Sequence, residues 1–439
     1  MSELPIVLVT GASGFVATHV VAGLLAEKKY RVRGTVRDVN NESSTKPLRE
    51  AFPDLELFPA DLSKDDGWKE AVAGCKYVHH IASPFPFDSP RDPQELIRPA
   101  VDGTRRVLGA CVEAGVKRVV MTSSIAAISS GIAGNVGKPR DHVYTPEDWT
   151  DPESPRCPTY EASKTLAEKE ARKFVAELED DKKFQLITIH PGAIYGPLIT
   201  PKVSTSHGLV VTFLKRQVTS VPDINMPYVD VRDVAKAHIA AMTGGTPGQR
   251  YILVSDTIPL RDLARVLADE FNHQGYRVPV SKMWKITLWI GKLFDEKAKL
   301  FYSYLGSCMK YDNSQVKELG VEFVGFKESV IETAYSLIIN QFVPRMVGFK
   351  EPGGGKEPNN TAEAKKDNEG EIAAEEGQGE KPAEEGKGEK PAEEMQGDDK
   401  PVDEGQGDKP VDEEEGDKPA DEGQGETPEG GGEEEKKEE

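Results

Sequence analysis

Short apolar runs rich in β-branched residues recur along the first 190 residues, and a helix-like stretch separates each run from the next. This alternation is typical of a mostly parallel sheet whose strands are joined by crossover helices. Runs such as IVLV and RVVM contain no alternating polar residues, as expected for strands covered on both faces. The candidate strands span 5–10, 31–36, 55–60, 76–82, 117–123 and 184–191. The sequence therefore predicts an α/β fold of the Rossmann type, with a doubly wound parallel sheet.

The regular alternation weakens after about residue 190. Segment 192–225 is rich in Pro, Thr and Ser, and the later elements are scattered. They comprise a helix over 231–242, a strand at RYILVS, a helix from about Arg261 and aromatic helical segments that continue to about 347. We expect residues 1–190 to form mainly the sheet core, and residues 191–350 to form mainly a smaller C-terminal lobe.

The last 89 residues differ sharply in composition from the rest of the chain. From Glu351 onward there are 33 Asp and Glu against 11 Lys, a net charge of −22, whereas residues 1–350 carry a net charge of +2. No Phe, Trp, Tyr or Leu follows residue 350, and Lys-Pro pairs recur about every nine residues from Lys381. A nine-residue repeat can indicate a β-solenoid, but these repeats lack an apolar residue that could stack. The composition instead predicts a disordered acidic tail over 351–439.

Several classes of protein are disfavoured by composition. No apolar run reaches the 18 residues that suggest a membrane span, and MSELPIVLVTG lacks the basic region of a signal peptide. The four cysteines have no metal-binding spacing and are interpreted as unpaired thiols of a reducing compartment: Cys75, Cys111, Cys157 and Cys308. We predict a cytoplasmic protein without a metal site and without a nucleic-acid partner, because the body has no basic stripe and the tail would repel phosphate. The tail could recruit a basic protein partner.

The first strand runs directly into TGASGFVATHVV, which places two glycines in a turn that opens a helix. Glycines here allow a tight turn and let the backbone approach a pyrophosphate, whose charge is favoured at a helix N-terminus. A plain turn between strand and helix is the alternative, but the position after a first strand favours a dinucleotide site. We expect Gly11, Ser13, Gly14, Phe15 and Val16 to contact the dinucleotide.

The residue at the end of the second strand bears on the choice between NAD and NADP. An NAD site requires a carboxylate there for the ribose 2′-hydroxyl, whereas Arg37 offers a guanidinium that suits the 2′-phosphate of NADP. Asp38 follows immediately and leaves the alternative open. We predict NADP(H) as the cofactor, so that residues 1–190 are mainly its binding core and residues 191–350 mainly a substrate lobe.

A Tyr and a Lys four residues apart open a predicted helix with the sequence TYEASKTLAEKEA. Tyr160 and Lys164 share one helical face, and a cation beside a phenol lowers the phenol's pKa, as a catalytic acid requires. An ordinary surface pair has the same spacing, so the two residues alone do not decide. Ser124 closes the fifth candidate strand at the edge where such sheets bind ligands, and it could hydrogen-bond a substrate carbonyl.

Together these motifs resemble the extended short-chain dehydrogenase/reductase family, over about residues 4–340. Within that family the chain is similar to dihydroflavonol reductase-like enzymes and to yeast ketone and methylglyoxal reductases. The motifs that carry the resemblance are TGASGFVA, the ADL at 60–62, HHIASPF at 79–85, TSS at 122–124, YEASK at 160–164, HPGAIYGP at 190–197, YVDVRDVAKAHIAA at 228–241 and KYDNSQVKELG at 310–320.

The resemblance implies a role for each matching residue. Tyr160 would be the general acid, Ser124 would hold the carbonyl oxygen, and Lys164 would bind the nicotinamide ribose and lower the pKa of Tyr160. Arg37 matches the arginine that binds the 2′-phosphate. The remaining implied cofactor contacts are Asp61 and Leu62 beside the adenine, Ala82 and Ser83 along the cofactor, and Pro191 and Gly192 beside the nicotinamide.

We therefore predict NADPH-dependent reduction of a small ketone or aldehyde substrate to an alcohol. Two alternatives stay open on the same scaffold: an epimerase or dehydratase, or an enzyme like 3β-hydroxysteroid dehydrogenase. A third is an NADP-binding scaffold whose tail acts as an adaptor. We interpret His79, His80 and His190 as packing residues rather than catalytic ones. The aromatic residues between Trp284 and Tyr304 either cover a pocket or pack in a helical core.

Overall fold

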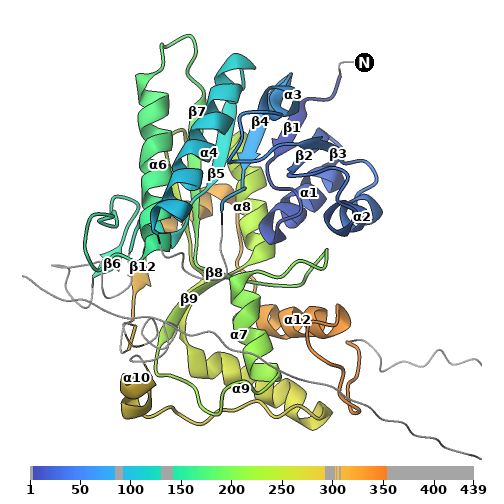
Figure 1. The fold of residues 1–439 in the computed structure, drawn as a ribbon, viewed down its shortest axis with the longest axis vertical. Coiled ribbons are helices and arrows are strands. Elements are labelled where there is room, and N and C mark those ends of the chain that lie inside the picture. Colours follow the sequence, from blue (N-terminus) through green and yellow to red (C-terminus); the bar gives the residue numbers. More distant parts are fainter. Residues whose placement is uncertain are drawn as a thin grey trace, which may run out of the picture. The chain divides into compact units, whose positions relative to one another are not determined.

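A seven-stranded parallel sheet forms the centre of the computed structural model, with strand order β10-β7-β5-β4-β1-β2-β3 (Figure 1). The structure describes residues 3–84, 92–129, 142–291, 302, 304–305 and 308–352. The strands are β1 (Ile6–Val9), β2 (Arg31–Val36), β3 (Glu56–Pro59), β4 (Cys75–His80), β5 (Arg118–Thr122), β7 (Gln185–Pro191) and β10 (Arg250–Leu253). The predicted Rossmann-type fold is confirmed, and each candidate strand begins and ends within two residues of its prediction.

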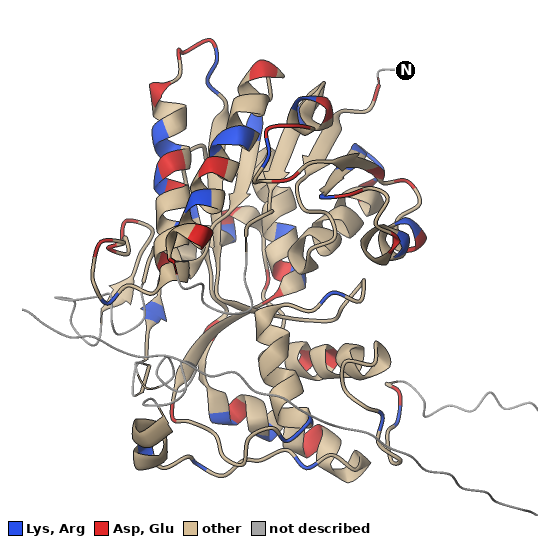
Figure 2. Cartoon of the chain, in the orientation of Figure 1, with Lys and Arg blue, Asp and Glu red and all other residues tan. Residues whose placement is uncertain are grey.

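Helices cover both faces of this sheet, which explains why its strands are continuously apolar. The helices are α1 (Phe15–Glu27), α2 (Glu42–Ala51) and α8 (Val231–Gly244) on one face, and α3 (Trp68–Val72), α4 (Gln94–Glu113) and α6 (Thr159–Glu177) on the other. Each face has its own apolar core, one of which includes Val9 and Val20 and the other Leu8 and Val107. Figure 2 shows charged residues gathered on the helices, with few on the strands between them.

Apart from the two cores of the central sheet, a separate apolar core lies among the later elements, and we call it the second core. It is built on a three-stranded sheet, in which β9 pairs parallel with β8 and antiparallel with β11. Its elements are β8 (Ala193–Tyr195), α7 (Thr205–Leu214), β9 (Asn225–Asp230), β11 (Asp256–Pro259), α9 (Leu260–Phe271) and α12 (Phe326–Ile339). The chain returns from the second core to the central sheet, because β9 leads directly into α8, which covers that sheet, and β10 joins it as a strand.

The remaining elements are short. They are β6 (Val143–Tyr144), β12 (Lys310–Tyr311), α10 (Lys285–Gly291) and the 3₁₀ turns η1 (Ile125–Ala127), η2 (Asn272–Gln274) and η3 (Ser314–Leu319). Strands β6 and β12 pair in parallel, and the Ser129 and Tyr311 hydroxyls lie 2.6 Å apart. These contacts bring a late segment of the chain against the loop that follows β5.

The order of the strands places a crevice beside β1. From β1 the chain builds β2 and β3 on one side and then crosses to β4 on the other, so the connections leave β1 and β4 in opposite directions. Ligands of open α/β sheets bind at this point, beyond the carboxyl ends of the strands. Thr10 ties the two strand ends together, because its hydroxyl oxygen accepts hydrogen bonds from the N–H groups of Ile81 and Ala82 at 3.0 and 2.9 Å.

The late aromatic residues fit neither of the two predicted roles as a group. Trp284 is 78% exposed and Trp289 46%, so neither packs in a core, whereas Tyr304 lines the main cavity. Phe294 and Phe301 lie outside the described residues, as does nearly all of the predicted disordered tail.

Two further observations concern the described part of the chain. None of its helices combines the length and the apolar composition that crossing a membrane requires. Its four cysteines form no disulfide with one another, and no group of three or more His, Cys, Asp or Glu in it is arranged to hold a metal ion.

Candidate active site

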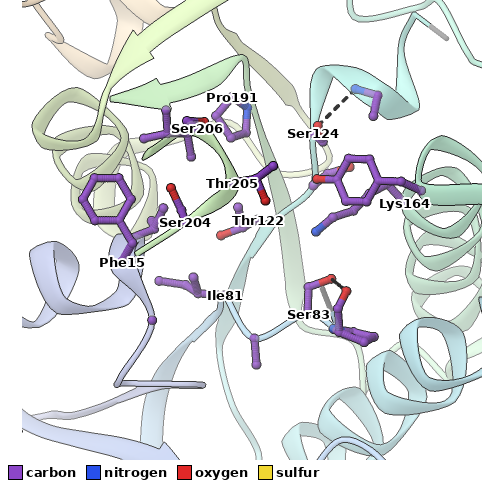
Figure 3. A pocket seen from close by; sticks show the side chains of 18 of the residues that line it. Phe15, Ile81, Ser83, Thr122, Ser124, Lys164, Pro191, Ser204, Thr205 and Ser206 are labelled. Carbon is purple, nitrogen blue, oxygen red and sulfur yellow. Dashed lines mark hydrogen bonds between the residues drawn. The ribbon is translucent and has the colours of Figure 1, made fainter. Parts of the chain in front are cut away.

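One cavity of about 960 Å³ lies at the carboxyl edge of the central sheet, and every predicted site residue lines it. Ser124 and Lys164 stand on one side of this cavity and Phe15 and Ser204 on the other, with Pro191 between them at one end (Figure 3). The residues come from the ends of β1, β2, β4, β5 and β7 and from helix α6. The structure therefore brings together residues that are up to about 180 positions apart in the sequence.

The turn after β1 is shaped to let a ligand approach the backbone. Gly11 has a φ of +66°, and a Cβ there would lie 3.1 Å from the Cβ of Ala82, so a larger residue would be both strained and crowded. Gly14 then begins helix α1 without a side-chain cap, and the first turn of α1 carries no acidic residue. The first N–H groups of α1 thus face the cavity without a competing side chain, as a bound pyrophosphate requires.

Arg37 and Asp38 differ in what they face. Arg37 lines the cavity with an exposed side chain, whereas Asp38 is not among the lining residues. The Asp38 carboxylate instead accepts the N–H of Asn40 at 2.9 Å, within its own turn. The group presented to a ribose at this strand end is therefore the guanidinium, which fits a 2′-phosphate. Asp61 lines the same region, and hydrogen bonds from Ser63 lower the pKa of its carboxyl.

Ser124, Tyr160 and Lys164 lie together on one side of the cavity. The hydroxyl of Ser124 is close enough to the phenol of Tyr160 to lower its pKa, and the ammonium of Lys164 lies 6.0 Å from the centre of the Tyr160 ring. Ser124 and Lys164 are 8% and 7% exposed. Ser124 is fixed because its oxygen accepts the N–H of Ala126 at 3.1 Å, which caps η1. A phenol, a hydroxyl and an amine are thus held around one point.

The expected lowering of the Tyr160 pKa is wrong for this structure. Burial raises the pKa of Tyr160 to about 12, against a lowering by the Ser124 hydrogen bond, and the charge of Glu161 raises it further. Burial also lowers the pKa of Lys164 to about 8. The prediction considered the cation alone, whereas desolvation disfavours both charged forms and outweighs the attraction between them.

Pro191 and Gly192 form the wall of the cavity at the end of β7. A Cβ on Gly192 would lie 2.8 Å from the carbonyl oxygen of Pro227, so only glycine lets β7 pass this close to β9. This contact joins the central sheet to the second core at the cavity.

Sequence reasoning missed a buried charged group on the side of α6 that faces the central sheet. Glu168 lies one turn beyond Lys164 with a side chain that is fully buried. Its Oε2 accepts hydrogen bonds from Ser123 Oγ and His190 Nε2, both at 2.7 Å. Its Oε1 accepts from Arg250 Nε at 2.8 Å and Arg172 Nε at 3.0 Å.

These bonds connect α6 to the ends of β5 and β7, which border the cavity, and to the first residue of β10. Ser123 precedes Ser124 at the end of β5, and His190 precedes Pro191 in β7. Arg250 of β10 also donates to the carbonyl oxygens of Ala127, Pro146 and Asp148. We call Glu168, Ser123, His190, Arg172 and Arg250 the Glu168 cluster. Its members are far apart in sequence, and only the YEASK-to-Glu168 spacing of one turn could have suggested any of them.

The charge states in the Glu168 cluster follow from its packing. Burial alone would raise the pKa of Glu168, but His190 and the two arginines hold that pKa well below its usual range. Burial lowers the pKa of His190 despite the nearby carboxylate. The cluster therefore contains an ionised Glu168 and a neutral His190 that donates from Nε2.

The histidines are buried, in agreement with the prediction that they pack rather than react. His79 is 0% and His80 2% exposed, and burial lowers the pKa of each to about 3. His80 lies 3.2 Å from the Thr10 hydroxyl, which fixes the end of β1.

Comparison with known proteins agrees with this geometry. Residues 7–253 match the model of the family described as "NAD dependent epimerase/dehydratase family". The chain belongs to this family. The match spans more than half of the chain and includes the glycine-rich turn, Ser124, Tyr160 and Lys164.

Several similar proteins are reductases. Cinnamoyl-CoA reductase CAD2 of Medicago truncatula is 34% identical, over 77% of this chain and 97% of that protein. An anthocyanidin reductase of Vitis vinifera is 33% identical, over 72% of this chain and 94% of that protein. The crystal structure of yeast methylglyoxal/isovaleraldehyde reductase Gre2 with NADPH has a TM-score of 0.63 and 30% identity, over 76% of this chain and 98% of that one. These matches confirm the predicted resemblance to the reductases of the extended family. They also confirm the expectation of an NADP-dependent oxidoreductase.

Proposed function

We propose that this protein reduces a ketone or aldehyde to an alcohol with NADPH, using Ser124, Tyr160 and Lys164 as its catalytic residues. The observation that carries the proposal is the grouping of the Ser124 hydroxyl, the Tyr160 phenol and the buried Lys164 amine in the cavity that the glycine-rich turn also lines. The reductase activities named for the relatives support the same reaction.

Tyr160 acts as the proton donor. NADPH, when bound, supplies a hydride to the carbonyl carbon. Because burial raises the pKa of Tyr160 to about 12, its phenol keeps its proton at neutral pH and can transfer it to the carbonyl oxygen. The Ser124 hydroxyl donates a hydrogen bond to the same oxygen. A positioned acid typically contributes a factor of about 10²–10⁴ to the rate, and stabilisation of the developing alkoxide contributes further.

Lys164 supports both the cofactor and the proton transfer. With a pKa lowered to about 8, its amine is largely protonated at pH 7 and can donate to the hydroxyls of the nicotinamide ribose. When Tyr160 gives up its proton, the same positive charge stabilises the phenolate that remains.

The cofactor preference rests on Arg37. Its guanidinium lines the cavity while Asp38 bonds within its own turn, so NADP(H) is favoured over NAD(H). A charge-assisted contact of this kind contributes about 1.5–3 kcal/mol.

An epimerase, a dehydratase or a hydroxysteroid dehydrogenase would use the same scaffold. An epimerase returns its hydride, so net consumption of NADPH with a simple carbonyl compound distinguishes a reductase from it. Arg37 favours the reductase, because sugar-nucleotide enzymes of this type commonly prefer NAD.

The test is NADPH oxidation at 340 nm against a panel of ketones and aldehydes, repeated with NADH. We expect turnover with NADPH and a lower kcat/KM with NADH. Tyr160→Phe should lower kcat at least about a hundredfold and leave the Kd for NADPH within about threefold. Equal losses of turnover and NADPH binding would show that Tyr160 is structural and would remove the basis of the proposal.

A further inference from the structure

Glu161 is a charged residue in an unusual place. It directly follows Tyr160 in the first turn of α6, its side chain is 8% exposed, and it lines the cavity. Glutamate is rarely buried to this extent unless it is paired with a cation. In the described residues, however, no Lys or Arg forms an ion pair with Glu161, and burial raises the pKa of its carboxyl.

The carboxyl of Glu161 is held by a hydroxyl from a distant part of the chain. Tyr304 lies 143 residues away and donates to Oε1 of Glu161 at 3.0 Å. Glu161 also accepts a hydrogen bond from its own backbone N–H. Two neutral donors therefore orient the carboxyl, and no Lys or Arg among the described residues neutralises its charge.

Other charged groups that line the cavity have different roles or lie elsewhere along it. Arg37 and Asp61 belong to the end of β2 and the turn after β3, and Lys164 faces the ribose in the proposed mechanism. Lys202 comes from the loop before α7. Glu161 is the carboxylate placed beside the proton donor, where its charge already raises the pKa of Tyr160.

We propose that Glu161 is a specificity-determining residue, which selects carbonyl substrates that carry a hydroxyl or a protonated amine and rejects those that carry a carboxylate. The inference rests on the proposed reduction. With Tyr304 bound to Oε1, the carboxylate retains acceptor capacity for a donor on the substrate. A substrate carboxylate would bring a second negative charge next to the carboxylate of Glu161 in this half-enclosed cavity, and like charges repel.

Glu161 would discriminate between substrates because a bound substrate without a donor leaves an acceptor site of the Glu161 carboxylate unsatisfied, which costs binding free energy. A site built around a buried acceptor discriminates strongly against an analogue that cannot satisfy it. Glu161→Gln keeps the shape and an acceptor for Tyr304 but removes the charge. The variant should therefore change the choice of substrate.

The experiment measures kcat/KM for four benzaldehydes that differ only at the meta position: aminomethyl, hydroxyl, methyl and carboxylate. Each value for a variant is divided by the wild-type value for the same aldehyde, so that intrinsic reactivity cancels. In Glu161→Gln the ratio of kcat/KM for the carboxylate over the methyl aldehyde should rise about tenfold, and the ratio for aminomethyl over methyl should fall about tenfold. Glu170→Gln, on the same helix and outside the cavity, should change neither ratio.

A second variant separates charge from shape. Tyr304→Phe removes a hydroxyl but retains the Glu161 carboxylate, so its aminomethyl-to-carboxylate ratio should equal or exceed that of the wild type. The inference is overturned if Glu161→Gln is folded and active with wild-type ratios, or if Tyr304→Phe matches Glu161→Gln. If the wild type consumes NADPH with none of these aldehydes or the ketone panel, the proposed reduction fails, and this inference fails with it.

Discussion

Helix α6 contains two neighbouring regions with the same four-residue spacing, one at the cavity and one in the core. Tyr160, Lys164, Glu168 and Arg172 follow one another every four residues along one face. The first two border the cavity, whereas Glu168 and its partners lie in the core between α6 and the strands. The two regions are about one helical turn apart.

They differ in how their charges are compensated. The Glu168 carboxylate accepts hydrogen bonds from two arginines, a histidine and a serine, and its pKa is held well below the usual range. Lys164 is buried to a similar extent, but burial lowers its pKa to about 8, and no described carboxylate forms an ion pair with it. The difference shows that the core satisfies its charge within the protein, while the candidate active site leaves a charge available for a ligand.

Removing the compensated charge should have the largest effect. Glu168→Gln leaves the guanidinium of Arg250, whose side chain is 6% exposed, without its counter-ion in the core. Breaking a buried ion pair in this way costs about 3–5 kcal/mol of unfolding free energy. Chemical denaturation of both proteins measures the difference.

Glu170→Gln is the matched control on the same helix. Glu170 pairs with Arg105, whose side chain is 55% exposed, so its loss should cost less than about 1 kcal/mol. Similar losses in the two variants would mean that the core ion pairs contribute no more than those at the surface, and the contrast between the regions would disappear.

Removing the uncompensated charge should instead stabilise the cofactor-free protein. Lys164 has a pKa of about 8 in the folded protein against 10.5 for a lysine in water, so folding disfavours its charged form. Lys164→Met should therefore raise the unfolding free energy by about 3 kcal/mol below pH 8. The advantage should shrink as the pH rises from 8 to 10.5, because in that interval the folded wild type has released the proton that its unfolded chain still holds, and the buried charge is gone.

Unfolding curves at pH 7 and pH 10 measure this dependence. Lys173→Met, at an exposed position of α6, should show no such trend with pH. A Lys164→Met protein that is less stable than the wild type at pH 7 would indicate that Lys164 is satisfied within the protein.

The smallest effects should come from two adjacent serines that face the two regions. Ser123 donates to Glu168 at 2.7 Å, so Ser123→Ala should cost about 1.5 kcal/mol of stability. Ser124 lines the cavity beside Tyr160 and lowers the pKa of its phenol, so Ser124→Ala should lower kcat by about 10²-fold. Thermal unfolding and steady-state assays of both variants distinguish them; equal losses of stability would mean that neighbouring residues do not separate the two regions.

The sequence supported the cofactor side of the site better than the rest. The glycine-rich turn, Arg37 and the Tyr160–Lys164 pair were predictable because each requires a particular residue type within a short stretch of chain. The direction of the Tyr160 pKa shift was not predictable, because it depends on burial by residues from other elements. Glu168 and Arg250 are ordinary helix and strand residues until the fold brings them within 2.8 Å of each other.

The same division holds for the whole molecule. Local periodicity and motif spacing were sufficient to predict the sheet, its helices and the family, since each of these is signalled by residues close together in the chain. Whether a charged side chain is compensated depends on which distant groups surround it, and burial makes that decision energetically large. The pairing of Glu161 with Tyr304 and the ion pair of Glu168 with Arg250 were therefore decided by tertiary structure alone.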